Sequence, residues 1–230
     1  MSNGVNAKAR REEEIAFLAM EQILGVDIRL ADAGGGAKMP DGCWSSADGS
    51  RRGIVEITSP PATDLLQAWA DAKRAGKPQG ESGSIPLRLN ELADVCAELL
   101  ETPWAQENIE KLRLQQADER HLFLFGRGHD VQHYFYRLSD PFEDGSSEFV
   151  GDLELPEGVS DVWFRGRALP EGDRPAGTIK LRLARYQSRV GWHRHLVAIE
   201  ELDLPSPNPS IADDIVPAHM RHPKERTAGM

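Results

Sequence analysis

Two carboxylates flank a tight polar turn in residues 39–58, which read MPDGCWSSADGSRRGIVEIT. The pair Asp48-Gly49 is typical of a two-residue hairpin turn, and apolar or β-branched residues lie on both sides of it. A turn centred there pairs residues whose numbers sum to 97, so Asp41 faces Glu56 across the hairpin. Like charges directly opposite each other destabilise a sheet, and a divalent cation between them removes the repulsion. The spacing therefore predicts a Mg²⁺ or Mn²⁺ site at Asp41 and Glu56.

Thr58 lies two residues beyond Glu56, so its side chain is expected on the same face of the strand. A simpler interpretation stays open beside the metal site. In it, Asp41 is a turn residue that follows Pro40, and Glu56 is a charge on an edge strand. A longer loop would also shift the register and separate the two carboxylates.

The elements that must position these residues can be followed along the chain. Residues 10–24 predict a helix with acidic residues in its first turn and Gly25 as its end, and 26–31 predict a short strand. After the hairpin, periodicity predicts helices and then strands. The expected helices are 62–76, 87–101 and 104–117, and the expected strands are 120–125, 159–168 and 178–187. Residues 133–138 fit either a strand or a short helix, and residues 191–202 close the fold.

This order predicts an α/β fold with a mixed central β-sheet flanked by helices. We expect one domain over residues 1–203, with a helical insertion at 62–103 after the core hairpin. Residues 204–230 are rich in Pro, Ser and charge and poor in apolar side chains, so they are expected to form a mobile C-terminal tail.

The charge balance limits how the chain can meet nucleic acid. The formal net charge is −10, whereas sequence-independent DNA binders gain affinity from a basic surface that neutralises phosphates. A nucleic-acid partner must therefore be bound through local patches or with a second protein. The candidate basic patches are Arg51-Arg52, Lys73-Arg74 and the series Arg182, Arg185 and Arg189.

Other groups of residues give weaker evidence for a functional site. His129 with His133, and His193 with His195, have the spacing of zinc ligands but lack an evident third ligand. The two cysteines, Cys43 and Cys96, form no disulfide framework. No apolar run reaches the ~20 residues of a membrane span, and the first residues lack a secretory core, so a cytoplasmic protein without membrane contact is expected.

With a helix, a Pro-Asp hairpin and Glu-x-Thr in that order, the chain resembles the PD-(D/E)xK nuclease superfamily, which has the restriction-endonuclease-like fold. The resemblance covers roughly residues 10–200. It implies that Asp41 is the metal-binding Asp and that Glu56 is the second acidic ligand. It further implies that Glu13 or Glu14 is the acidic residue that many members add from the first helix.

The chain departs from this family at Thr58, where a lysine is usual. Some members move the basic group to the following helix. Here Lys111 and Gln115 lie four residues apart on one face of the helix expected at 104–117, just before a strand. The resemblance therefore implies a catalytic set of Asp41, Glu56, Thr58, Lys111 and Gln115.

Two functions are compatible with these residues. The first is a metal-dependent nuclease that hydrolyses phosphodiester bonds of DNA or RNA and leaves a 5′-phosphate. The second is a catalytically inactive module of the same fold that binds nucleic acid or a protein partner, including a second copy of itself, within a larger complex such as a phage-defence assembly. The missing lysine and the negative charge favour the second, and the carboxylate pair favours the first.

Overall fold

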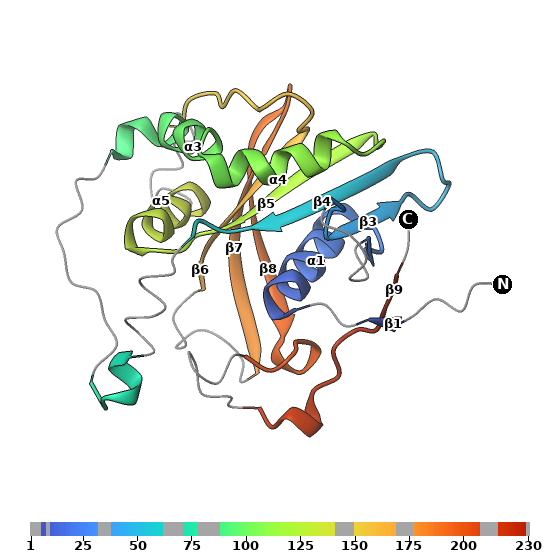
Figure 1. The fold of residues 1–230 in the computed structure, drawn as a ribbon, viewed down its shortest axis with the longest axis vertical. Coiled ribbons are helices and arrows are strands. Elements are labelled where there is room, and N and C mark those ends of the chain that lie inside the picture. The colour runs from blue at the N-terminus through green and yellow to red at the C-terminus, as the bar shows by residue number, and fades with distance from the viewer. Residues whose placement is uncertain are drawn as a thin grey trace.

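The computed structural model describes residues 6–7, 10–31, 38–61, 71–77, 88–140, 150–168, 177–207 and 216–228. It has an α/β fold in which helices flank a mixed sheet of seven strands (Figure 1). The helices are α1 (Arg11–Leu24), α3 (Leu92–Leu100), α4 (Pro103–Arg113) and α5 (His129–Ser139). The strands are β1 (Asn6–Ala7), β2 (Arg29–Leu30), β3 (Gly42–Ser45), β4 (Arg52–Thr58), β5 (Glu119–Phe125), β6 (Asp161–Ala168), β7 (Thr178–Gln187), β8 (Gly191–Glu200) and β9 (Arg226–Thr227).

The main sheet has the strand order β2-β3-β4-β5-β6-β7-β8, so strands adjacent in sequence are adjacent in space. Antiparallel pairing joins β2, β3 and β4 at one side and β6, β7 and β8 at the other. The central strands β4, β5 and β6 are parallel, because α3 with α4 and then α5 return the chain across the sheet. The carboxyl ends of these three strands therefore lie at one edge of the sheet.

The predicted register of the hairpin is confirmed. Gly42 pairs with Val55 and Ser45 pairs with Arg52, so the partner numbers sum to 97. The predicted two-residue turn is wrong, because the strands end at Ser45 and resume at Arg52. The Asp48 carboxylate accepts hydrogen bonds from Ser46 and Ser50 and stabilises a longer loop. Because the loop extends equally on both sides of Asp48-Gly49, its length does not change the register.

The sheet separates two buried apolar layers. On β5, Leu122 and Leu124 belong to the layer beneath α3, α4 and α5, whereas Phe123 and Phe125 belong to the layer beneath α1. Figure 1 shows α3, α4 and α5 together on one side of the sheet and α1 on the other. The alternation along β4 places Val55 toward α1 and Ile54 toward α4. Glu56 and Thr58 follow Ile54 at a spacing of two, so they lie on the α4 side.

Several predicted elements have the expected type. The first helix ends at Leu24, with Gly25 in the left-handed conformation (φ +67°) that favours glycine. The helix predicted at 104–117 is α4, which starts at Pro103 and ends at Arg113, four residues before the predicted end. Residues 133–138, left open between strand and helix, belong to α5. In the expected insertion, 71–74 and α3 are helical, and residues 62–70 and 78–87 lie outside the described residues.

The described part of the C-terminal segment does not fit the expected mobile tail. Arg226 has no exposed side-chain surface, donates to both carboxylate oxygens of Glu14 (2.8 and 2.7 Å) and also donates to Glu21 (2.7 Å). Its guanidinium also lies 4.8 Å from the ring centroid of Phe17. Composition alone could not show this docking, because it depends on one arginine that meets carboxylates about 200 residues away.

Arg226 should therefore contribute strongly to stability. Removing one partner of a buried ion pair costs about 3–5 kcal/mol, because the other charge is left buried and unpaired. We expect Arg226→Ala to lower the free energy of unfolding in urea by about that amount. Lys224→Ala, which removes a neighbouring cation with a partly exposed side chain, should cost less than about 1 kcal/mol. Equal effects of the two substitutions would show that the Arg226 pair is not a major contact.

None of the helices in the described part of the chain has the length and apolarity needed to cross a lipid bilayer.

Candidate functional site

The two carboxylates of the hairpin meet at the carboxyl end of β4. Asp41 immediately precedes β3, and its Oδ2 accepts a hydrogen bond of 2.7 Å from the backbone amide of Ile57. This bond holds Asp41 beside Glu56, as the register requires. The arrangement follows from the sequence locally, because Pro40 and Asp41 directly precede the strand that pairs with β4.

Lys111 comes from α4 and pairs with Glu56. Its Nζ donates to Glu56 Oε1, so the helix that crosses to the parallel strand also supplies a cation to the carboxylate. The Glu56 side chain is only 2% exposed, and its second oxygen, Oε2, is buried without a hydrogen-bond partner. A buried carboxylate oxygen that lacks a donor is costly, and a bound cation would satisfy it.

Burial disfavours the charged forms of both carboxylates. It raises the pKa of Glu56 to about 8, with the nearby charge of Asp41 adding to the rise and Lys111 opposing it. Burial also raises the pKa of Asp41 to about 6, against the hydrogen bond from Ile57 and with a further rise from Glu13. Two neighbouring carboxylates with raised pKa values are typical of a site that binds a cation or moves protons.

These pKa values predict how stability depends on pH. A carboxyl group whose pKa is higher in the folded chain binds more protons when folded, so its stabilisation is complete below its unfolded pKa. For Glu56 that stabilisation is lost as the pH rises from about 4.5 through about 8. Without metal, Glu56→Gln should melt above the wild type at pH 8.5, by at least about the 2–4 °C that corresponds to 1 kcal/mol, and close to it at pH 4.5.

Melting temperatures from circular dichroism in a chelator provide the measurement. Glu110→Gln, which changes an exposed carboxylate on α4, should follow the wild type at both pH values. A Glu56→Gln variant that melts below the wild type at pH 8.5 would contradict the raised pKa.

The first helix places its two candidate ligands differently. Glu13 lies close enough to Asp41 to raise its pKa, and its Oε2 caps the helix by accepting from the Arg10 amide (2.7 Å). Glu14 is held by Arg226 in the buried ion pair. Of the two residues left open by the sequence, Glu14 is therefore bound to Arg226, and Glu13 acts on the site through the effect of its charge on Asp41.

A polar stripe on α4 lies along the same hairpin. Asn108 Nδ2 donates to Thr58 Oγ1 at 3.1 Å, one helical turn before Lys111. Gln115, just beyond the end of α4, donates from Nε2 to the backbone oxygen of Lys38 at 3.3 Å. Lys111 and Thr58 are thus brought to Glu56, whereas Gln115 contacts the chain that leads into Asp41. The sequence analysis missed Asn108, although it lies at the i−3 position from Lys111.

The carboxylate pair fits a divalent cation as a site completed by water. Among the residues that the structure describes, no group of three His, Cys, Asp or Glu side chains is arranged to hold a metal ion. Mg²⁺ is commonly held by only one or two carboxylates and keeps several waters. The unpartnered Glu56 Oε2 and the adjacent Asp41 supply such a donor pair.

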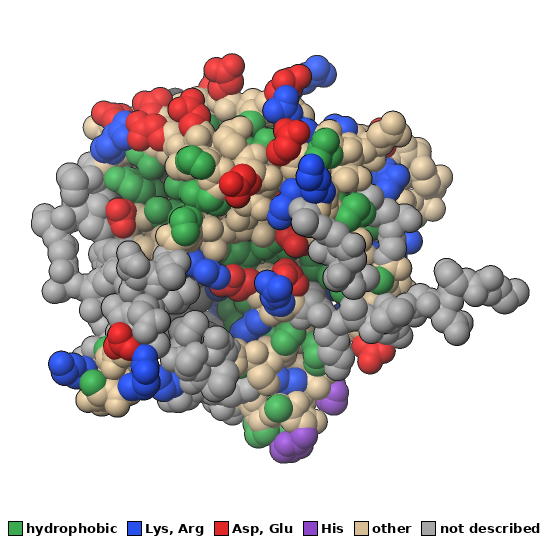
Figure 2. Space-filling model, viewed as in Figure 1, with side chains coloured by type: hydrophobic (Ala, Val, Ile, Leu, Met, Phe, Trp, Pro, Cys, Tyr) green, Lys and Arg blue, Asp and Glu red, His purple; other side chains and the backbone are tan. Residues whose placement is uncertain are grey.

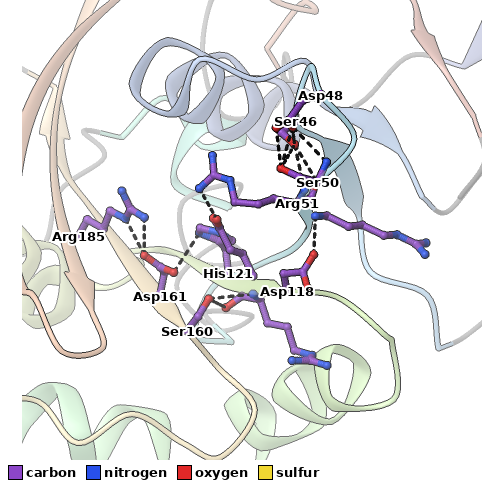
Figure 3. Close-up of polar contacts among 12 residues, drawn as sticks. Ser46, Asp48, Ser50, Arg51, Asp118, His121, Ser160, Asp161 and Arg185 are labelled. Atoms are coloured by element: carbon purple, nitrogen blue, oxygen red, sulfur yellow. Dashed lines mark hydrogen bonds and ion pairs between the residues drawn. The ribbon is translucent and has the colours of Figure 1, made fainter.

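A second polar cluster lies on the α1 side of the sheet, around His121, Asp161 and Arg185 (Figure 3). His121 is fully buried, and its Nδ1 accepts from the Trp163 indole at 3.0 Å. Arg185 donates to Asp161 Oδ1 at 2.7 Å, beside the same imidazole. These contacts connect β5, β6 and β7 near the amino ends of β5 and β6. His121 pairs with Val55 and the next residue, Leu122, pairs with Glu56, so the cluster is separated from Glu56 by the sheet itself and not by distance along the strands.

The visible molecular surface has no uniformly basic face. Figure 2 shows acidic side chains gathered over α3, where Glu91, Asp94, Glu98 and Glu101 are exposed. Basic and acidic side chains alternate elsewhere in this view. A polyanion would be repelled over α3, so this part of the surface disfavours contact with a long nucleic acid.

Comparison of the chain with protein-family models, with curated proteins and with solved structures finds no match.

Proposed function

We propose that the chain is a metal-dependent nuclease that hydrolyses phosphodiester bonds through the site at Asp41 and Glu56. The observation that carries this proposal is the pair of adjacent carboxylates with raised pKa values, one of which has an unpartnered buried oxygen and a lysine from the next helix. A structural ion pair would need only one carboxylate and one cation. The second carboxylate beside that pair adds repulsion, which a bound divalent cation would offset.

Asp41 and Glu56 would hold Mg²⁺ or Mn²⁺, and the charge of Glu13, which acts on Asp41, would add to the attraction for the ion. When bound, such an ion lowers the pKa of a coordinated water and polarises a phosphoryl oxygen. Lys111 lies against Glu56, where it favours the ionised carboxylate and would stabilise negative charge that develops on the phosphate. Gln115 holds the backbone near Lys38 and thereby the approach to Asp41.

The reaction is a hydrolysis at phosphorus. The oxygen of a water molecule forms a bond to phosphorus, and the bond from phosphorus to the 3′ oxygen breaks. The proton lost by the water is balanced by the proton gained by the departing 3′ oxygen. The resemblance to the PD-(D/E)xK superfamily implies this product, a 5′-phosphate, and the restriction-endonuclease-like form of the fold. The helix, hairpin and crossing helix around Glu56 support that finer assignment.

A catalytically inactive module of the same fold is the second candidate. The pairing of Lys111 with Glu56 favours it, because that cation satisfies one of the two carboxylates without any metal. The exposed acidic residues over α3 also disfavour a long polyanion on that surface. Such a module would bind nucleic acid or a protein partner but would have no turnover.

A cleavage assay distinguishes the two candidates. Purified chain would be incubated with single-stranded and double-stranded DNA and RNA, each with Mg²⁺, with Mn²⁺ or with a chelator. The nuclease predicts products with 5′-phosphate ends that form only with a divalent ion. Absence of cleavage on every substrate, together with absence of metal uptake, would leave only the inactive module.

A further inference from the structure

The contact between Thr58 and Asn108 fixes which groups donate protons. Asn108 Nδ2 donates to the backbone oxygen of Trp104 at 2.7 Å and to Thr58 Oγ1 at 3.1 Å. The Trp104 carbonyl can only accept, so the nitrogen end of the amide must face it. Both protons of the amide nitrogen are then used, and Thr58 Oγ1 is the acceptor of the second one.

This assignment leaves the Thr58 hydroxyl proton for a different partner. Because its oxygen already accepts from Asn108, the hydroxyl can act toward the site as a donor. Within the described residues no bond donated by this hydroxyl is seen, although Thr58 lies two residues beyond Glu56 on the same face of β4. The donor is thus directed by a side chain of α4 at the position where the resemblance leads one to expect a lysine.

We infer that Asn108 is a positioning residue that orients the Thr58 hydroxyl, and that this hydroxyl donates its proton to a non-bridging oxygen of the scissile phosphate. The inference rests on the proposed nuclease function. A phosphoryl oxygen is an anionic acceptor and suits a hydroxyl whose proton has no other acceptor in the described part of the chain. A neutral hydroxyl is a weak base, so the proton of the attacking water must be accepted by another group. Two residues then share the roles of the lysine that PD-(D/E)xK nucleases usually have. Lys111 supplies the positive charge, and Thr58 supplies the oriented hydrogen-bond donor.

Substitutions on both sides of the contact test the division. Thr58→Val removes the donor and should lower kcat/KM by about 10²-fold, the lower range for loss of one preorganised donor to a developing negative charge. Thr58→Ser should retain most activity. Asn108→Ala, which frees the hydroxyl to rotate, should cost about tenfold, and Glu107→Ala, at an exposed neighbouring position of α4, should cost nothing.

Asn108→Asp is the sharpest variant, because a carboxylate accepts the Thr58 proton and withdraws it from the substrate. It should lose as much activity as Thr58→Val and more than Asn108→Ala. The double variant Thr58→Val/Asn108→Asp controls for the added negative charge, because it carries the new carboxylate but has no hydroxyl to lose. It should be little less active than Thr58→Val alone. An equally large loss on adding Asn108→Asp to Thr58→Val would assign the effect to charge and overturn the inference. Melting temperatures identify any variant that fails to fold.

Phosphorothioate substrates test the contact with the phosphate directly. In the wild type, sulfur at the oxygen bound by Thr58 should slow cleavage of one diastereomer, and in Thr58→Val that diastereomer should lose much of its penalty. The other diastereomer serves as the control. If the wild type cleaves but both penalties are unchanged in Thr58→Val, the inference fails and the nuclease function stands. If the wild type cleaves no nucleic acid, both fail.

Discussion

Asp41→Asn is expected to abolish metal-dependent cleavage and, at the same time, to stabilise the metal-free protein. Loss of a Lewis acid costs several kcal/mol of transition-state stabilisation, and each 1.36 kcal/mol is a factor of ten, so the rate should fall by at least about 10³-fold. Stability should rise at pH 8 because the substitution removes a desolvated charge that also repels Glu56. The opposite signs separate loss of function from loss of fold.

Cleavage rates and urea denaturation of the same preparations give both values. Asp48→Asn is the matched control, because that carboxylate is exposed in the loop of the same hairpin. It should keep the wild-type cleavage rate. Equal rates for the Asp41 and Asp48 variants would remove Asp41 from the mechanism, and a destabilised Asp41→Asn protein would contradict the raised pKa.

Lys111→Ala should reduce cleavage by about 10²–10³-fold while metal uptake is retained. Lys111 donates to Glu56 and would stabilise charge that develops on the phosphate, and loss of one such preorganised donor has an effect of this size. Metal uptake persists because the ammonium does not ligate the ion. Removing Lys111 also leaves Glu56 Oε1 free to bind the metal ion, because the ammonium no longer occupies it. Single-turnover cleavage and calorimetric titration with Mn²⁺ measure the two properties separately.

Thr58→Lys is the reciprocal test, because it introduces the lysine that PD-(D/E)xK nucleases usually have at this position of the strand. Added to Lys111→Ala, it should recover part of the lost rate. Arg113→Ala, which removes an exposed cation from the same helix, is the control and should change neither property. Full activity of Lys111→Ala would show that the lysine has not moved to α4.

The geometry of the hairpin could be predicted because it depends on local rules. Asp48-Gly49 centres the turn, and the period of two along each strand then brings Asp41 to Glu56. The loop is longer than predicted, yet the register is unaffected because the extension is symmetric. Lys111 could also be named as a candidate from the order of elements, since a helix that crosses between parallel strands passes over the first of them.

The selection between Glu13 and Glu14 could not be made from the sequence. Helical periodicity places the two side chains about 100° apart but does not say which direction faces the sheet edge. The docking of Arg226 onto Glu14 decides it, and that contact spans 212 residues. The same long-range ion pair docks a C-terminal segment whose composition had predicted a mobile tail. Asn108 was missed for a related reason, because its role appears only in the bond to Thr58.

The proposed nuclease depends on a divalent metal site formed by Asp41 and Glu56. Calorimetric titration of the chain with Mn²⁺ at pH 8.5, above the raised pKa values of both carboxylates, tests it without any substrate. We predict uptake of one ion per chain by the wild type, weaker uptake at pH 5 where protons compete, and none by the double variant Asp41→Asn/Glu56→Gln. Absence of uptake by the wild type, or equal uptake by the double variant, would contradict a metal site at these carboxylates.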